Sequence, residues 1–305
     1  MGDAGAVTTF QEHATVLTLP ATAPFDFDAS LAFVHGFAPT RGEQEAGDGR
    51  LVAAMRAAGA TVLASVTAAT DGPGVQVSLR ADGPLGADAA SAAGARIAFW
   101  LSLDDDLAPF YEIARQDAAF RPVVERLHGY HQVKFASPWE NVAWAILAQR
   151  TPMPVAQRAK RALVEHVGNA VDEDGRTWWA FPDAGQVAGL DRAVLAGVVG
   201  NERKAGFLHE SAQRWTTFDE DLLRTAPHDT VRDLLLGLPG IGPWSASFVM
   251  IRGLGRMESV SADREMLRAA TRVYGHPVDE AELAQLAEPY GTWAGYWAHY
   301  LHASS

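Results

Sequence analysis

The sequence predicts an α+β protein in which a small antiparallel α+β part precedes an all-α part. Apolar residues alternate with a period of two before residue 103 and recur at helical spacing after it. With 305 residues, 48% of them apolar, the chain is long enough for two domains. No apolar run reaches the ~18 residues that a membrane span needs. We therefore expect a water-soluble protein with domains at 1–103 and 104–305.

The expected N-terminal domain is built around a hairpin. Residues 60–69 and 74–81 both alternate apolar and polar side chains, and they flank the turn sequence Thr70-Asp71-Gly72-Pro73. Residues 15–19 form another alternating run that stops at Pro20. The other expected elements are a short helix at 28–37, a polar loop at 39–49 and a strand at 96–101.

The expected C-terminal domain is helical throughout. Asp104, Asp105 and Asp106 precede an apolar stretch, where carboxylates cap a helix and interact favourably with its dipole. Trp139, Val142, Ala143, Ile146 and Leu147 fall on one helix face, in a helix that ends before Pro152. Further helices are expected at 155–167, 184–198, 203–215, 219–225, 229–236, 243–253, 264–273, 279–287 and after Trp293.

Composition excludes several classes of protein. The chain has no cysteine, which rules out disulfides, a thiolate nucleophile, a zinc–thiolate site and an iron–sulfur cluster. The N-terminus has neither a basic region nor an apolar core of the kind found in secretory signals, so we expect a cytoplasmic protein without membrane contact. The net charge is −12, and residues 1–130, with 8 basic and 16 acidic side chains, carry most of it. The remainder is close enough to neutral to form one basic face.

The segment 238–246 (LPGIGPWSA) is the most informative part of the sequence. An apolar helix leads into it, and a second helix leaves at Pro243, since proline is favoured in the first turn of a helix. Gly240 and Gly242 allow a tight turn with bare amides, and Ile241 anchors this turn in the core. Such a turn suits a phosphate oxygen, although an ordinary helix–helix connection would have the same pattern.

This segment, followed about twenty residues later by Asp263 at the start of a helix, resembles the helix-hairpin-helix/Gly-Pro-Asp superfamily of DNA glycosylases. Within it, the chain is most similar to the 3-methyladenine DNA glycosylase II branch. The stretches 144–149 (WAILAQ), 200–205 (GNERKA) and 290–296 (YGTWAGY) resemble other elements of this branch. The resemblance implies a TATA-binding-protein-like N-terminal domain and a catalytic domain of two helical lobes.

The resemblance also implies a reaction, a partner and a catalytic residue. The partner is double-stranded DNA with a damaged base, which is flipped into a pocket before its N-glycosidic bond is hydrolysed. Asp263 matches the catalytic carboxylate, which stabilises positive charge at C1′; alone, an aspartate before a helix would be read as an N-cap. Strand-cleaving members carry a lysine in the second hairpin helix. This chain has Trp244 there and no lysine after Lys204, so we expect a monofunctional enzyme that leaves an abasic site.

Aromatic residues at the family's pocket positions suit cationic alkylated purines such as 3-methyladenine and 7-methylguanine. Electron-rich rings attract a cation by ~0.5–2 kcal/mol per contact. The four matching positions are Trp244, Phe248, Trp293 and Tyr296, for which core packing is the alternative interpretation. The resemblance implies no cofactor, apart from an optional structural monovalent cation at the hairpin.

Further residues are expected to contact DNA. Besides Gly240, Ile241 and Gly242, they include Gln149, Arg150, Arg203 and Lys204. Arg150 stands where the family inserts a wedge into the gap left by the flipped base, and stacking, phosphate contact and simple solvation are alternatives for its side chain. A stripe of Arg158, Lys160 and Arg161 is another candidate phosphate contact.

Two features limit these expectations. The spacing of His128 with His131 and of His299 with His302 lacks a third ligand, so we predict no metal site. The acidic charge predicts modest, salt-sensitive DNA binding. A DNA repair enzyme of this family would act at the nucleoid, and we expect no obligate protein partner. An inactive DNA-binding or lesion-recognition protein is the alternative function.

Overall fold

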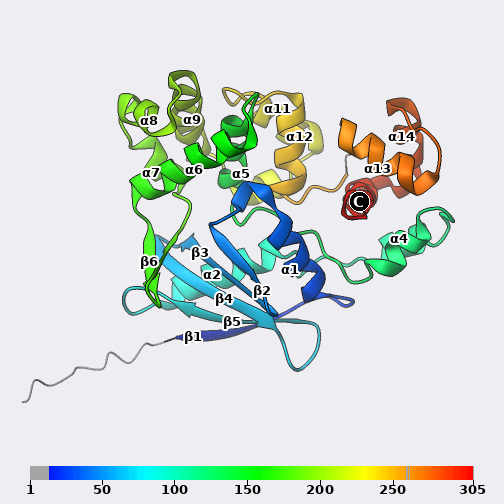
Figure 1. The fold of residues 1–305 in the computed structure, drawn as a ribbon, viewed down its shortest axis with the longest axis horizontal. Helices are drawn as coiled ribbons and strands as arrows, with labels where there is room; N and C mark the ends of the chain where they lie inside the picture. Colours follow the sequence, from blue (N-terminus) through cyan, green and yellow to red (C-terminus); the bar gives the residue numbers. More distant parts are fainter. Residues whose placement is uncertain (1–13, 259, 261, 305) are drawn as a thin grey trace, which may run out of the picture.

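The computed structural model describes residues 14–258, 260 and 262–304 and consists of an antiparallel sheet and two groups of helices (Figure 1). The strand order is β1-β5-β4-β3-β2, and every neighbouring pair is antiparallel. The strands are β1 (Thr15–Pro20), β2 (Gln44–Gly47), β3 (Arg50–Ala57), β4 (Ala60–Ala68) and β5 (Gly74–Arg80). The predicted α+β class is confirmed.

Tight turns set the register of this sheet. The predicted hairpin is present as β4 and β5, in which Ala68 pairs with Val75. Asp48-Gly49 joins β2 to β3, and Ala58-Gly59 joins β3 to β4. All four of these turn residues have positive φ, the backbone twist that two-residue hairpins require.

Two predictions for the N-terminal part were wrong. Residues 96–101 were expected as a strand, but they lie at the end of helix α2 (Ala87–Trp100). This helix is rich in alanine and buries Ala90, Ala93, Ile97 and Trp100 along one stripe against the sheet, so helix propensity and a helical period agree. The expected loop at 39–49 contains most of a short 3-10 helix, η1 (Ala38–Thr40), as well as β2. Helix α1 (Phe27–Gly36) is present as predicted.

A first helical group lies above the sheet in Figure 1 and has its own apolar core. Its helices are α5 (Pro138–Ala148), α6 (Met153–Val167), α7 (Ala184–Ala188), α8 (Arg192–Val199), α9 (Glu202–Trp215), α10 (Glu220–Thr225), α11 (His228–Leu236) and α12 (Pro243–Arg252). The single helix expected at 184–198 is two helices, because Gly189 ends α7 and Asp191 caps α8.

A small hairpin interrupts this group. Strands β6 (Ala170–Glu173) and β7 (Arg176–Trp179) were not predicted, and they are joined by Asp174-Gly175. Val171 and Trp178 pack against Val52 and Leu63 of the large sheet. The hairpin therefore connects the first helical group to the sheet.

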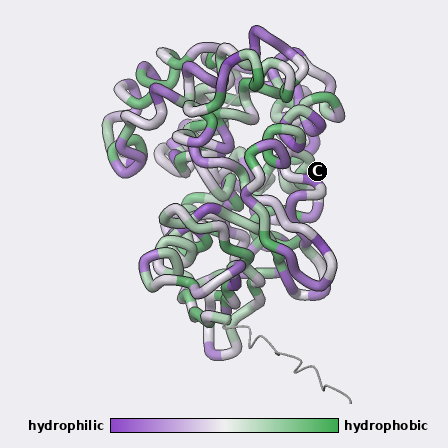
Figure 2. Tube along the Cα trace, turned by 90° about the vertical axis from the view of Figure 1, so that its left-hand side faces the viewer, coloured by the Kyte–Doolittle hydropathy of each residue, from purple (hydrophilic) through white to green (hydrophobic). Residues whose placement is uncertain are grey.

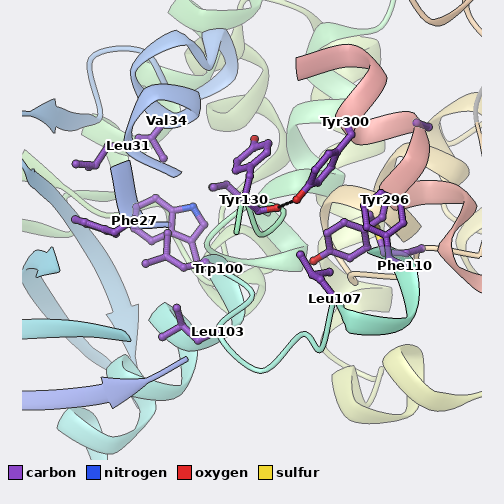
Figure 3. Close-up of a cluster of buried hydrophobic side chains, with 14 of the residues drawn as sticks. Phe27, Leu31, Val34, Trp100, Leu103, Leu107, Phe110, Tyr130, Tyr296 and Tyr300 are labelled. Carbon is purple, nitrogen blue, oxygen red and sulfur yellow. Dashed lines mark hydrogen bonds between the residues drawn. The ribbon is translucent and has the colours of Figure 1, made fainter. Parts of the chain in front are cut away.

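The second helical group shares one core with the sheet. Its elements are α3 (Ala108–Ala114), α4 (Arg121–Arg126), α13 (Arg264–Tyr274), α14 (Glu280–Ala287), η2 (Glu288–Trp293) and α15 (Ala294–Ala303). Figure 3 shows Phe27 and Trp100 of the N-terminal part in the same cluster as Phe110, Tyr296 and Tyr300. The Tyr300 hydroxyl donates to the Tyr130 carbonyl oxygen at 2.8 Å within this cluster.

Within the described residues, no helix is both long and apolar enough to cross a bilayer. In Figure 2, hydrophilic and hydrophobic stretches alternate along the tube in both the upper and the lower part of the molecule. The N-terminal elements end with α2 and the next helix begins at Ala108, so we retain 1–103 and 104–305 as the proposed division.

Candidate active site

The glycine turn between α11 and α12 presents free backbone donors. Ile241 is 6% exposed and packs in the core of the first helical group, which fixes the turn. Gly240 has a φ of +82°, and a Cβ there would lie 2.6 Å from the ring of Phe207, so only glycine fits. The amides of Gly240 and Gly242 have no acceptor among the described residues. With the unpaired first amides of α12, they form a site suited to an anion.

The turn after α5 lies beside this glycine turn. Gln149 donates from Nε2 to the carbonyl oxygen of Gly240 at 3.3 Å. Arg150 is exposed and has a φ of +49°, in the left-handed region that arginine rarely adopts. Gln149 and Arg150, both predicted from the sequence to contact DNA, therefore lie on the same surface as the glycine turn.

The ammonium of Lys204, predicted to contact a phosphate, is hydrogen-bonded within the protein instead. Its Nζ donates to the carbonyl oxygen of Leu147 and to Oγ1 of Thr151, so the ammonium holds the end of α5 and the turn that follows. Partial burial lowers the pKa of Lys204. Arg203 is exposed, and its guanidinium lies 5.2 Å from the ring centroid of Phe207, beside the hairpin.

Asp263 is both a helix cap and a cavity residue. Its Oδ1 accepts from the amides of Glu265 at 3.0 Å and Met266 at 2.9 Å, which begins α13. These two donors and the positive end of the helix dipole stabilise a carboxylate anion. Oδ2 has no hydrogen-bond partner among the described residues. Ser261, two residues earlier in the motif, lies outside the described residues.

A cavity of about 670 Å³ contains Asp263 in its wall, and its lining comes from both parts of the chain. Helix α1 and the residues after it contribute Phe33 and Phe37, while α12 contributes Phe248. Helix α15 contributes the small residues Gly295 and Ala298. The volume is within the range of about 300–1,000 Å³ typical of small-ligand sites.

Arg252, at the end of α12, is the cation of this cavity. It is 9% exposed and its guanidinium lies 4.6 Å from the ring centroid of Phe33 and 5.0 Å from that of Phe37. No side-chain hydrogen bond or ion pair of Arg252 is present among the described residues, and its Nη2 is completely buried. Burial lowers the pKa of Arg252 to about 10, which leaves the side chain charged at neutral pH.

His299 and Gln132 add uncharged polar groups to the same wall. Burial and the neighbouring Arg252 hold the pKa of His299 well below its usual value, so the ring is neutral at pH 7. His299 Nε2 and both polar atoms of the Gln132 side chain are buried without a partner among the described residues. Buried polar atoms are normally paired, so three such side chains around one cavity require an explanation.

The four predicted pocket aromatics separate into two pairs. Phe248 lines the cavity, and Trp244 stacks on it with ring centroids 5.3 Å apart and planes 8° apart. Trp244 is 54% exposed and extends this aromatic surface into solvent. Trp293 and Tyr296 are not in the described lining of the cavity. Tyr296 is held in the shared core because its hydroxyl donates to Asp105, and Trp293 packs against it and Phe110.

The three residues of the predicted basic stripe, Arg158, Lys160 and Arg161, do not all face solvent. Lys160 is fully buried, with Nζ 2.6 Å from both Glu43 Oε2 and Glu140 Oε1. A phosphate contact through Lys160 is therefore corrected to a buried ion pair. Across the described part of the chain, no group of three or more acidic or histidine side chains is arranged to hold a metal ion.

Sequence reasoning missed Arg252, Gln132, Phe33 and Phe37. Two spacings contain a signal for three of these residues. Phe248 and Arg252 are four residues apart in α12, which places them on one helix face, and Phe33 lies four residues before Phe37, the residue that ends α1. The convergence of these faces with Gln132 depends on the packing of α1 against the helical groups, for which the sequence has no local signal.

The structure combines a glycine turn between two helices with a cavity that has a carboxylate in its wall. No protein-family model matches the chain. It is 26% identical over 216 residues to the DNA-3-methyladenine glycosylase of Bacillus subtilis, covering 66% of this chain and 68% of that protein. It is 29% identical over 288 residues to a probable bifunctional transcriptional activator/DNA repair enzyme AlkA of Mycobacterium tuberculosis, covering 93% of this chain but 56% of the relative.

Solved structures agree on the fold. The 3-methyladenine DNA-glycosylase from Archaeoglobus fulgidus superposes with a TM-score of 0.75 at 20% identity, covering 94% of this chain and 97% of the other. The homologues and structural neighbours include DNA-3-methyladenine glycosylases, which confirms the resemblance stated from the motifs.

Proposed function

We propose that this chain is a monofunctional DNA glycosylase that removes alkylated purines of the 3-methyladenine and 7-methylguanine type. In this proposal the N-terminal part is the TATA-binding-protein-like domain, and the helices form the two lobes of the catalytic domain. The observation that supports it best is that Asp263 lies in the wall of a cavity lined by Phe33, Phe37 and Phe248. A stacking surface beside a carboxylate is what excision of a flipped base requires.

One rigid element connects DNA binding to this cavity. Helix α12 begins at the glycine turn and contributes Phe248 and Arg252 to the cavity from its second half. At a rise of ~1.5 Å per residue, its ten residues span ~15 Å. A phosphate on the amides of Gly240 and Gly242 would therefore hold the strand at a fixed distance from the pocket, with Gln149 and Arg150 beside it.

The chemistry assigned to the site is hydrolysis. As the C1′–N bond breaks, its electron pair leaves with the base, and the free Oδ2 of Asp263 stabilises the positive charge that develops on the sugar. The cationic alkylated base leaves as a neutral purine, and water then forms the new bond to C1′ and releases a proton to solvent. The products are a free base and an abasic site.

The lysines support a monofunctional reaction. The chain has three, Lys134, Lys160 and Lys204, and none of them lines the cavity. Each ammonium is engaged elsewhere: Lys134 with Phe99 O and Ser102, Lys160 with its two glutamates, and Lys204 with the end of α5. A side-chain amine for a Schiff base, which strand cleavage needs, is not available there.

Defined substrates test the proposal directly. Duplexes carrying one 3-methyladenine-type or 7-methylguanine lesion should give free base and an alkali-labile site. Without alkali, the strand should stay intact. Release of no base from any lesion duplex would refute the enzyme, and strand cleavage without alkali would refute the monofunctional assignment.

We predict that the two hairpin glycines respond differently to alanine. Gly240→Ala meets Phe207 at 2.6 Å and requires a positive φ, so it should lower the free energy of unfolding by ~1–3 kcal/mol. At Gly242, φ is −100° and a Cβ has nothing within 4 Å, so Gly242→Ala should change stability by less than ~0.5 kcal/mol. Its methyl would stand beside the free amide, so DNA affinity should fall about tenfold. Urea unfolding and fluorescence anisotropy measure the two effects, and unchanged DNA affinity in Gly242→Ala would exclude this turn as the DNA contact.

A further inference from the structure

We propose that Lys204 is a positioning residue that holds the turn after α5 in the conformation that presents Arg150 to DNA. Its loss would then impair removal of a paired base from a duplex far more than removal of an unpaired one. The inference rests on the proposed glycosylase function, and it concerns a residue that serves this function without touching the substrate.

The turn after α5 has a strained residue at its centre. The amide of Thr151 donates to the carbonyl oxygen of Ala148 at 3.1 Å, which closes the turn. Gln149 has a φ of −56° and a ψ of 120°, and Arg150 has a φ of +49°. These are the features of a type II β-turn, whose third position favours glycine because it needs a positive φ. Arginine is disfavoured there, so the conformation persists only where neighbouring groups hold it.

Lys204 supplies these holding contacts from α9. The amide of Thr151 bonds within the turn and not to Leu147, four residues earlier, so the carbonyl oxygen of Leu147 needs another donor. The ammonium of Lys204 donates to this oxygen at 2.5 Å and also to Oγ1 of Thr151. The Thr151 hydroxyl donates in turn to the carbonyl oxygen of Gln149 at 3.0 Å. The backbone on both sides of Arg150 is therefore connected to one ammonium.

Helix α9 supports this turn and the glycine turn together. Lys204 and Phe207 are three residues apart on α9, so they share one helix face. The ring of Phe207 packs so closely on Gly240 that an added Cβ would lie 2.6 Å from it. Gln149 Nε2 donates to the Gly240 carbonyl oxygen at 3.3 Å. The lysine therefore fixes the position of Arg150 relative to the backbone amides that we assign to a phosphate.

The side chain of Arg150 is exposed and makes no hydrogen bond, ion pair or ring contact within the residues that the structure describes. Strained backbone conformations cluster at functional sites, where they prearrange a group for its partner. In the proposed enzyme, the flipped base leaves a gap in the duplex, and a guanidinium can stack on the bases that border it. Such a gap forms only where the base was paired and stacked, so the effect of the turn should depend on the DNA substrate.

The test compares two DNA substrates that carry the same lesion. In one duplex 7-methylguanine is paired with cytosine, and in the other it is bulged, with no nucleotide opposite. A bulged base costs less to extrude, and the duplex can close behind it. Single-turnover excision rates on both substrates are measured for each variant, and urea unfolding of the same preparations monitors stability.

Lys204→Met should lower excision of the paired lesion by at least about tenfold and excision of the bulged lesion by less than about threefold. Arg150→Ala should show the same pattern. The double variant Lys204→Met/Arg150→Ala should be no slower on the paired lesion than Arg150→Ala, because both changes remove the same contact.

Two further variants separate this role from a general structural one. Thr151→Val removes the hydroxyl but keeps Lys204 and the volume of the side chain, so excision of the paired lesion should fall by about fivefold. It replaces Lys204→Met if that variant does not fold. Arg126→Met is the matched control, because Arg126 Nη2 also donates to a carbonyl oxygen at the end of a helix, that of Ser304 at 3.3 Å, and does not line the cavity. Both of its excision rates should stay at the wild-type values.

Three results would overturn the inference and leave the proposed function intact. One is that Lys204→Met lowers both rates by the same factor, or neither rate, which would make Lys204 a structural residue only. Another is that the losses of the two single variants multiply in the double variant, which would separate Lys204 from Arg150. The third is wild-type excision of the paired lesion by Arg150→Ala. Release of no base from any lesion duplex by the wild-type protein would instead refute the glycosylase function itself.

Discussion

Replacing Asp263 by asparagine is expected to lower base excision at least about a hundredfold without unfolding the protein. The asparagine oxygen can still accept from the amides of Glu265 and Met266, because Asn and Asp are nearly equivalent helix caps. Only the negative charge is lost, so the free energy of unfolding should change by less than ~1 kcal/mol. Single-turnover excision and urea unfolding of the same preparation measure both quantities.

A matched control separates the cap from the chemistry. Asp279 caps α14 in the same way, with Oδ1 accepting from the amide of Glu282 at 2.9 Å, and it does not line the cavity. Asp279→Asn should therefore leave excision unchanged. Excision by Asp263→Asn at the wild-type rate would show that the carboxylate is only a cap, and a protein that binds DNA but releases no base would support the lesion-recognition alternative.

Asp263 illustrates why a local interpretation and a functional one can both hold. From the sequence, an N-cap and a catalytic carboxylate are competing interpretations of an aspartate before a helix. The structure places Oδ1 on two amides and the residue in the cavity wall, so the cap fixes the carboxylate while Oδ2 has no hydrogen-bond partner in the described part of the chain. The helix start was predictable from local chemistry, whereas the cavity required the packing of α1 and α15 against α12.

There are also physical reasons why some helices and strands were not predicted from the sequence. Asp48-Gly49 and Asp174-Gly175 are strong two-residue hairpin signals, and each joins a pair of strands that was not predicted. The strands they join are short or lack alternation: β2 has four residues, and β3 carries buried residues at consecutive positions. At 96–101 the bulky residues suggested a strand, but the alanines before them extend a helical stripe. Turn chemistry was the better signal in the first two cases, and helical period in the third.

The pocket aromatics show where resemblance is weaker than packing. Trp244 and Phe248 stand on α12 at i and i+4, and they stack as this spacing allows. Trp293 and Tyr296 occupy matching positions in the sequence, but Asp105 accepts the Tyr296 hydroxyl and draws that ring into the core. The hydrogen bond from the Tyr296 hydroxyl to Asp105 fixes the direction of the ring, and Asp105 is 191 residues away in sequence.

Lys160 yields the other large predicted effect. Its Nζ lies 2.6 Å from Glu43 and from Glu140 and donates to the carbonyl oxygen of Pro39 at 3.2 Å. Lys160→Met would leave two carboxylates facing each other, one of them on a buried residue of α5, so the free energy of unfolding should fall by about 3–5 kcal/mol at pH 7.5. The neighbouring Arg161→Met removes an exposed i, i+4 pair with Glu165 and a charge interaction with Glu43 weaker than that of Lys160, and it should cost less than ~0.5 kcal/mol.

The dependence of this effect on pH follows from Glu43. Burial already raises the pKa of Glu43, and Lys160 opposes that shift. Without the cation, the folded-state pKa of this carboxyl rises further above its unfolded value, so protonation favours the folded state. The stability deficit of Lys160→Met should therefore shrink between pH 7.5 and pH 5, as urea unfolding at both values would measure. A deficit that is constant with pH, or no larger than that of Arg161→Met, would contradict this assignment.

The same lysine connects stability to the cavity. Lys160 and Gln157 of α6 donate to the carbonyl oxygens of Pro39 and Ala38, and these two residues are part of the cavity wall next to Phe37. A side chain that the sequence suggested as a phosphate contact thus holds the wall on which Arg252 rests. We expect Lys160→Met to lower the single-turnover rate of base excision even where the protein remains folded, because the cavity wall that carries Phe37 would lose one of the two hydrogen bonds that hold it to α6.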